Sequence, residues 1–318
     1  MQENQETINI LFLGGAKRVS LARKLIDAGA DMGLRVNIYS YELTSRVPIA
    51  SVGIVIVGRR WDDPELYAHL HEVVLVAEIS VMIPFFDAAV VATGKYISLY
   101  GDVWAPVMKP HLAESFYDKT ISAVLFEENN LPIPATYKSG RPHFPLIAKP
   151  RYGTGGKGIM IINDVNSFRR VLRHKEEYLL QQYFSNIEEY TVDCYIPQRG
   201  KAVCISPRRR LEVLGGEVSR TVTVDSPEIV EASARAIERL RLRGAVTLQF
   251  LRDLDSGELM LMEIDPRLGG GVVCSIHAGA EIPRHILDEA RGIQPRQHKK
   301  IKPGVLICRY FDEAVFNV

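Results

Sequence analysis

The sequence predicts a doubly wound α/β domain followed by an α+β region. Three observations support this fold class. The stretch 8–13 is an apolar run that ends in two glycines, apolar residues then recur at helical spacing from Val19 to Ala30, and 34–39 is apolar again. Such a strand, helix, strand unit is typical of a parallel sheet. With 318 residues, 47% of them hydrophobic, the chain is long enough for two or three units with their own cores.

Charge and composition narrow the function. The chain has 39 Lys and Arg against 38 Asp and Glu, so it lacks the net positive field that nonspecific nucleic-acid binding needs. Its first residues are polar, and no stretch reaches the roughly 18 apolar residues of a membrane-spanning helix. We therefore expect a cytoplasmic protein that acts on small molecules, with neither nucleic acid nor a membrane as partner.

The four cysteines form no recognisable metal or disulfide pattern. Cys194, Cys204, Cys274 and Cys308 lie far apart without a CxxC pair. This spacing favours reduced thiols packed in strands over a zinc site or a disulfide scaffold.

Further elements follow along the chain. A helix is expected from Pro64 to about Ile79, then a short strand at 81–83 and a turn at Pro84, and the first domain is expected to end near 106–110. Beyond it, helices are predicted at 119–129, 164–174 and 227–241. Strands are predicted at 146–149, 159–162, 178–184, 190–196, 202–206, 220–224, 245–251, 258–264 and 305–310, with a hairpin turn at 255–257.

A glycine-rich segment, KPRYGTGGKG, lies between two of these predicted strands. Its glycines allow positive φ angles and bring backbone amides close to an anion, and Lys149 adds a positive charge. The segment runs into a strand, so it is no dinucleotide fingerprint, and Gly158 stands where a Walker A loop needs Ser or Thr. A flap over phosphates is the functional interpretation, and a plain surface hairpin is the alternative.

Two carboxylates close an apolar strand later in the chain. Period-two alternation places Glu263 and Asp265 on one face, with Arg267 just beyond and Gln249 on the preceding strand of the hairpin. Paired oxygen ligands suit a magnesium ion that also holds substrate phosphates. The alternative is a solvated strand end in which Asp265 pairs with Arg267.

Four motifs occur in a characteristic order: Lys119 in a DK pair, KPRYGTGGKG, QQYFSNIEEYTVD and MEIDPRLGG. In these motifs the chain resembles the carbamoyl phosphate synthetase large-subunit-like branch of the ATP-grasp superfamily. The resemblance implies a Rossmann-like pre-ATP-grasp domain at 1–110, followed by a two-subdomain ATP-grasp fold. Its parts would be a lid with the glycine-rich loop at 111–184 and a C-terminal subdomain with the metal site at 185–318. ATP would lie between these last two.

The resemblance also implies roles for single residues. Lys119 and Lys149 would contact the nucleotide phosphates, and Glu189 would hold the ribose hydroxyls. Arg267 and Lys149 would be the catalytic residues that act on the transferred phosphoryl group. The mobile loop would comprise Gly153, Thr154, Gly155, Gly156 and Gly158, the adenine hinge Gln182, Tyr183 and Phe184, and the magnesium site Gln249, Glu263 and Asp265. The superfamily more often has Asn where Asp265 stands, which leaves Mn²⁺ open as the metal.

The implied activity is that of an ATP-dependent carboxylate-amine ligase that forms an acyl phosphate and releases ADP. Phosphorylation of bicarbonate or carbamate is one alternative, and a non-catalytic ATP-binding regulatory protein is another. Weaker candidates for substrate contact are Arg208, Arg210, Arg220 and the N-terminal loop residues Gly14 and Gly15, with Asp87 as a helper. The run 208–210 is equally consistent with a solvated turn or a cluster of ion pairs. A homodimer stays open as the oligomeric state.

Overall fold

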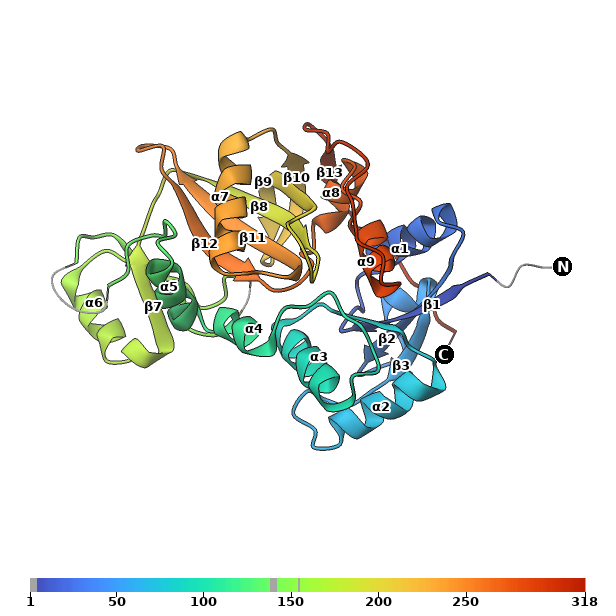
Figure 1. Cartoon of the computed structure of the whole chain (residues 1–318). Coiled ribbons are helices and arrows are strands. Elements are labelled where there is room, and N and C mark those ends of the chain that lie inside the picture. The colour runs from blue at the N-terminus through green and yellow to red at the C-terminus, as the bar shows by residue number, and fades with distance from the viewer. Residues whose placement is uncertain (1–4, 138–141, 154, 318) are drawn as a thin grey trace.

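The computed structural model describes residues 5–137, 142–153 and 155–317, so Thr154 of the predicted loop lies outside the described residues. Within these ranges the fold is mixed α/β, with a parallel sheet first and antiparallel sheets after it, as predicted. Figure 1 shows the N-terminal sheet towards one end of the molecule and the small sheet of β7 at the other.

The N-terminal domain is a parallel sheet with strand order β3-β2-β1-β4. Its elements are β1 (Thr7–Leu13), α1 (Val19–Asp31), β2 (Arg35–Glu42), η1 (Pro48–Ser51), β3 (Ile54–Val57), α2 (Leu66–Val76), β4 (Val81–Pro84) and α3 (Asp87–Tyr100). Alternation along β1 sends Ile10 and Phe12 into the core shared with α1, and Leu11 and Leu13 into the core shared with α2 and α3. Helices therefore cover both faces, and the loops after the strands gather at the carboxyl edge.

The segment from 142 to 182, called the lid below, contains an antiparallel sheet of order β6-β5-β7. Its elements are β5 (Leu146–Pro150), β6 (Met160–Ile162), α6 (Val165–Leu172), η2 (Lys175–Glu177) and β7 (Tyr178–Gln182), preceded by α4 (Pro110–Tyr117) and α5 (Lys119–Glu128). Asp164 caps α6 by accepting hydrogen bonds from two backbone amides. The buried residues of the lid form a core separate from the other two: Leu146, Ala148, Ile162, Phe168, Val171 and Leu180. The lid is therefore a packing unit of its own.

The large antiparallel sheet has strand order β12-β11-β8-β9-β10-β13. Its elements are β8 (Ile187–Ile196), β9 (Cys204–Leu214), β10 (Glu217–Thr223), α7 (Pro227–Arg239), β11 (Gly244–Asp253), β12 (Leu259–Asp265), α8 (Val272–His277), α9 (Ile282–Ala290) and β13 (Leu306–Cys308). Helix α7 packs on the sheet, whereas α8 and α9 return to the N-terminal domain, where Figure 1 shows α9 beside α1. Shared cores thus join the first and last parts of the chain.

The structure differs from the expectations in several elements. β9 continues to Leu214, well past the predicted end at 206, because its arginines pair with carboxylates on β8. The elements β3, α3, α4, α8 and α9 are missing from the prediction. Cys194, Cys204 and Cys274 are buried free thiols, although Cys274 lies in a helix, and Cys308 is exposed. In the described ranges no helix has the length and apolarity needed to cross a membrane. The expected domain boundaries stay predictions.

Gly244 opens β11 where the large sheet meets the end of the N-terminal domain. Its φ angle is +80°, and a Cβ at this position would overlap the carbonyl oxygen of Pro106. The next amide, that of Ala245, donates to the same oxygen at 2.8 Å. Glycine is therefore needed at position 244, because other residues rarely adopt this φ angle and because any Cβ would clash with Pro106.

We predict that Gly244→Ala destabilises the protein by about 3 kcal/mol or more, because left-handed strain adds to a clash with backbone that cannot move aside. Gly257→Ala is the matched control. Its φ angle is +79° and nothing lies within 4 Å of the added Cβ, so only the strain remains. Urea unfolding followed by circular dichroism measures both free energies. Equal losses in the two variants would contradict the close contact at Pro106.

Candidate active site

The candidate site is built on the paired ends of β11 and β12. Gln249 lies opposite Glu263 in the register of the two strands. Asp265, the last residue of β12, accepts a hydrogen bond from Gln249 Nε2 at 3.3 Å and another from Arg267 Nη2 at 3.0 Å. The structure therefore brings these four predicted residues together.

Asp87 joins this group from the N-terminal domain. It is the first residue of α3, where the helix dipole favours a carboxylate. Its Oδ1 accepts a hydrogen bond from Arg267 Nε at 3.1 Å, and the two side chains are only 15% and 13% exposed. Arg267 is thus held between one carboxylate on helix α3 and one on strand β12, and Asp87 contacts a predicted catalytic residue instead of standing free for a substrate.

The electrostatics of Glu263 define the centre of the site. Burial raises the pKa of Glu263 to about 7, the charges of Asp265 and Asp87 act in the same direction, and Lys119 and Lys149 oppose them. Carboxylates this close to one another are stabilised by a shared cation. These interactions also show that both lysines lie within electrostatic range of the carboxylates.

Lys149 and Lys119 reach this centre from the lid side. Lys149, on β5, donates from Nζ to Gln181 Oε1 at 3.0 Å, and burial lowers the pKa of this lysine. Lys119, the first residue of α5, donates from Nζ to the carbonyl oxygen of Gly153 at 2.7 Å. One lysine therefore faces the carboxylates from the lid sheet, while the other fastens the glycine-rich loop.

The base of the loop is anchored by Asp118. This carboxylate caps α5 by accepting hydrogen bonds from the amides of Thr120 and Ile121. It also accepts a hydrogen bond from Arg151 Nε at 2.6 Å and one from the Tyr152 hydroxyl at 3.0 Å. The DK pair thus fixes the first part of the loop through both of its side chains.

The glycine-rich loop rests on the turn between β9 and β10. Its described glycines have φ angles of +117°, +72°, +72° and +76° at Gly153, Gly155, Gly156 and Gly158. A Cβ on Gly155 would lie 3.4 Å from the carbonyl oxygen of Gly215, and a Cβ on Gly216 would overlap the Cα of Gly155. Glycines on both sides let the two backbones touch, so the loop reaches from the lid to the large sheet.

Two of the three backbone amides in the predicted adenine hinge donate hydrogen bonds within the protein. The amides of Gln182 and Tyr183 donate to the carbonyl oxygens of Ala135 and Pro145 at 2.9 and 3.3 Å. No hydrogen bond to the amide of Phe184 is found among the residues that the structure describes. The Phe184 amide is thus the one of the three that is left to donate to a ligand in the described ranges, and the adenine hinge at Gln182, Tyr183 and Phe184 stays a prediction.

Glu189 is connected to the carboxylates through Arg210. Arg210 Nε lies 3.4 Å from Glu189 Oε2, and Arg210 Nη1 donates to Gln249 Oε1 at 2.7 Å. The Gln249 oxygen thus accepts a hydrogen bond in this structure, and the assignment of Gln249, Glu263 and Asp265 as magnesium ligands stays a prediction. In the described ranges no group of three or more His, Cys, Asp or Glu side chains could hold a metal ion.

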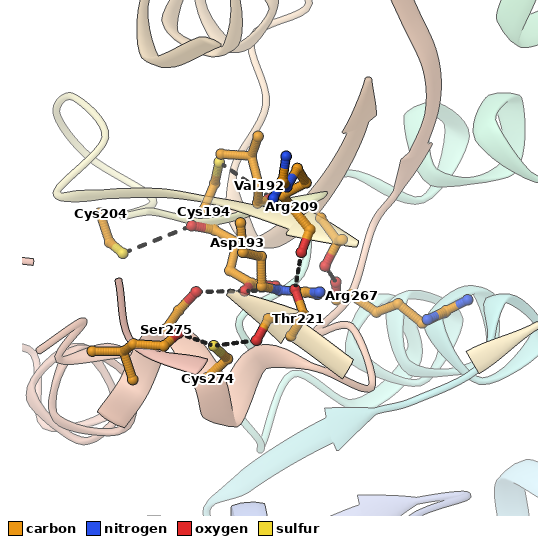
Figure 2. A network of polar contacts seen from close by, with 12 residues as sticks. Val192, Asp193, Cys194, Cys204, Arg209, Thr221, Arg267, Cys274 and Ser275 are labelled. Atoms are coloured by element: carbon orange, nitrogen blue, oxygen red, sulfur yellow. Dashed lines mark hydrogen bonds and ion pairs between the residues drawn. The ribbon is translucent and has the colours of Figure 1, made fainter. Parts of the chain in front are cut away.

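Arg208 has a structural position, which differs from the substrate contact suggested by the sequence. Its side chain is 2% exposed, and its Nε lies 2.8 Å from Asp193 Oδ2, which also accepts a hydrogen bond from Ser275 Oγ at 2.7 Å. Figure 2 shows Asp193 and Ser275 facing each other beside Cys274. Of the two alternatives for the run 208–210, the ion-pair cluster is confirmed, and it lies within β9.

The remaining weak candidates do not join the cluster. Arg220 is exposed on β10, and no polar contact links its side chain to the site within the described ranges. Gly14 and Gly15 lie in the loop after β1, where the amides of Gly15 and Ala16 donate to the carboxylate of Glu42. The loop therefore binds a carboxylate of its own domain.

Arg18 is a functional candidate that the motifs do not reveal. Its guanidinium lies 5.4 Å from the ring centroid of Phe85, and burial lowers the pKa of Arg18 to about 10. It faces Gly270, beside the ion pair of Arg309 Nη1 with Glu217 Oε2 at 2.8 Å. Among the described residues no acceptor is hydrogen-bonded to the Arg18 guanidinium. In the sequence Arg18 stands out only as part of the basic pair Lys17 and Arg18 in a loop, a pattern that is also typical of a solvated turn.

Comparisons with known proteins found similar sequences and similar folds. A family model described as "ATP-grasp in the biosynthetic pathway with Ter operon" matches residues 174–311. The N-terminal section of the carbamoyl phosphate synthase large chain from Methanopyrus kandleri is 23% identical over 140 residues, which is 39% of this chain and 25% of that protein. The chain thus spans about a quarter of this curated relative.

Solved structures match over almost the whole chain. The biotin carboxylase domain of 2-oxoglutarate carboxylase from Hydrogenobacter thermophilus, solved with MgADP, ADP and bicarbonate, has a TM-score of 0.75 at 16% identity, covering 95% of this chain and 74% of that one. The L-amino acid ligase from Bacillus licheniformis has a TM-score of 0.66 at 15% identity, covering 91% and 75%. These similarities establish the fold.

We predict that Asp193→Asn lowers the free energy of unfolding by about 3–5 kcal/mol, because Arg208 then keeps its charge in buried surroundings without a counter-ion. Ser275→Ala removes one hydrogen bond from the same carboxylate and should cost about 1–2 kcal/mol. Urea denaturation of both variants gives the comparison. An Asp193→Asn variant with unchanged stability and weakened substrate binding would show that Arg208 serves the substrate after all.

Proposed function

We propose that this ATP-grasp protein is an ATP-dependent ligase that activates a carboxylate as an acyl phosphate and joins it to an amine. One juxtaposition carries the proposal: the lysines on the lid side, Lys119 and Lys149, lie within electrostatic range of the carboxylate of Glu263. The glycine-rich loop also touches the large sheet at Gly216. A triphosphate with its cation fits between an anion-binding loop and paired oxygen ligands.

Different residues of this chain would bind the metal ion, the phosphates and the adenine ring. Glu263 and Asp265 would hold magnesium, or manganese, because carboxylate oxygens are the ligands these ions prefer. When bound, the ion neutralises charge on the phosphates during phosphoryl transfer. Lys149 and Lys119 would bind phosphate oxygens, and the Phe184 amide would meet the adenine edge. Arg267, fixed by Asp87, would face the transferred phosphoryl group.

The acid would be bound near Arg18. This guanidinium lies beside Gly270, in the loop that follows Arg267, and the charge of Arg267 acts on it. Arg18 is half-buried and its guanidinium donates to no acceptor among the described residues, so an anion that accepts its hydrogen bonds is favoured there. A carboxylate at this position would lie between the two arginines, next to the phosphoryl group that it attacks.

A smaller acid is the second candidate. One solved structure with this fold contains bicarbonate together with MgADP, and a matching relative is a carbamoyl phosphate synthase. Bicarbonate or carbamate would take the place of the organic carboxylate at the same arginines. Release of ADP with each class of acid separates these two reactions from each other and from a regulatory ATP-binding protein without turnover.

We predict that magnesium-dependent ADP release is stimulated by one member of a pool of carboxylic acids together with an amine. Glu263→Gln and Arg267→Ala should each lower kcat/KM by about 100-fold to 1,000-fold, because each removes a charge that acts on the phosphoryl group. A coupled assay for ADP measures this.

Two exposed residues supply the controls. Glu258→Gln and Arg235→Ala make the same chemical changes away from the candidate site, so both should keep near-normal turnover. Full activity in Glu263→Gln or Arg267→Ala would refute the roles assigned to these residues. ADP release that no acid stimulates would refute the ligase reaction.

The contact between the loop and the large sheet gives a separate prediction. Gly216→Ala places a methyl group on the Cα of Gly155 and should weaken ATP binding about tenfold or more, because the loop can no longer close. Gly215→Ala is the matched control, since its φ angle is also positive, at +58°, and nothing lies within 4 Å of its Cβ. Calorimetric titration with a non-hydrolysable ATP analogue measures both affinities. Equal affinities would mean that this contact plays no part in nucleotide binding.

A further inference from the structure

A pocket of about 530 Å³ opens at the carboxyl edge of the N-terminal sheet. The loops after all four of its strands contribute to the lining, among them Gly14 after β1, Glu42 at the end of β2, Trp61 after β3 and Phe86 after β4. The volume suits a small organic molecule, and this edge is where open α/β sheets bind ligands. Gly14 is one of the weaker substrate candidates from the sequence, and no residue that takes part in the proposed phosphoryl transfer lines this pocket.

The walls of the pocket are mostly aromatic and aliphatic. The rings of Tyr41 and Trp61 lie with their centroids 6.4 Å apart, and Phe86 and Leu43 line the same space while 53% and 63% exposed. Gly14 has a φ angle of +74°, and a Cβ there would overlap the ring of Phe86. The glycine thus allows the aromatic wall to close against the backbone. Such exposed apolar surface favours a ligand with an apolar body.

The charges in the pocket leave one carboxylate without a cation. Arg59 pairs with Glu65 at 3.2 Å and Arg60 with Asp62 at 3.1 Å, so each arginine already has an acidic partner. Glu42 accepts hydrogen bonds from the Ser40 hydroxyl at 2.7 Å and from the amides of the loop after β1. No Lys, Arg or His forms an ion pair with Glu42 within the described ranges. The pocket therefore favours a ligand that brings a positive charge.

Glu42 also excludes an anionic ligand at this edge. In dinucleotide-binding domains the amides of the loop after the first strand bind a pyrophosphate. Here the amides of Gly15 and Ala16 already donate to the Glu42 carboxylate. A phosphate or carboxylate of a ligand would have to displace that group and then lie beside its charge.

We propose that this pocket binds the amine substrate, as an ammonium ion that carries an apolar or aromatic substituent. The ammonium group would lie between the Glu42 carboxylate and the face of Trp61, an arrangement in which carboxylate and aromatic ring both attract a cation. The inference rests on the proposed ligase function, because it assigns the second substrate of that reaction. The pocket is also next to the candidate site, since Phe86 immediately precedes Asp87, which binds Arg267.

Trp61 allows a direct test, because the chain has only two tryptophans. Titration with a series of primary amines of increasing apolar size, such as butylamine, cyclohexylamine and phenylethylamine, should change the Trp61 emission in a saturable way. The isosteric alcohols and carboxylic acids should bind at least tenfold more weakly. Trp61→Phe should abolish the signal and leave the emission of Trp104 unchanged, which identifies the pocket as its source.

Glu42→Gln keeps an acceptor for the loop amides and removes the charge, so it should raise the dissociation constant of the amine about tenfold or more. Glu72→Gln, an exposed change on α2, should leave it unchanged. Equal binding of amine and alcohol, no effect of Glu42→Gln, or no saturable binding by any amine of the series would overturn the proposal.

The ADP assay separates this proposal from the ligase assignment. If amines bind at Trp61 and none stimulates ADP release with any acid, the pocket stands as an ammonium site and the ligase function fails. If an amine stimulates ADP release and Glu42→Gln leaves its KM unchanged, the ligase function stands and the pocket assignment fails.

Discussion

The site depends on one constraint, which is the pair of hydrogen-bonded ion pairs that Arg267 forms with two carboxylates. Asp265 belongs to the large sheet and Asp87 to the N-terminal domain, and both accept hydrogen bonds from the one guanidinium. The planar fork of arginine makes this possible, because Nε and Nη2 point towards different acceptors. A lysine could not hold the same two groups in fixed directions. The loop after β4 and the end of β12 must therefore keep their relative positions if Arg267 is to face a phosphoryl group.

The sequence predicts those parts of the fold whose patterns are local. β1, α1 and β12 show clear apolar periodicity, and the structure places them within a few residues of the expected bounds. Helix α3 shows no such stripe, because it has buried residues from Ala89 to Tyr96 on several sides. The length of β9 is decided by partners on β8, at Asp193 and the two glutamates before it, so no local pattern reveals it.

The same distinction applies to the site. Motif order leads to Lys149, Glu263, Asp265 and Arg267, whose chemistry is visible in the residue types themselves. Whether an arginine faces a ligand or a buried partner depends on residues far away in the chain. Arg208 is a candidate for substrate contact in the sequence, but in the structure its buried guanidinium pairs with Asp193, which Ser275 also contacts. Arg18 looks solvated and lies beside Gly270, more than two hundred positions later.

The return of α9 to α1 bears on how the chain acquires its structure during synthesis. One apolar core contains Leu21 and Leu25 of α1 together with Ile282, Ile286 and Leu287 of α9. Helix α1 is thus completed by a helix more than two hundred positions later, and it exposes an apolar face until that helix is made. Contacts so distant along the chain are slow to form, since the intervening loop must close first. The nascent chain is therefore open to aggregation, or in need of a chaperone, until α9 has been translated.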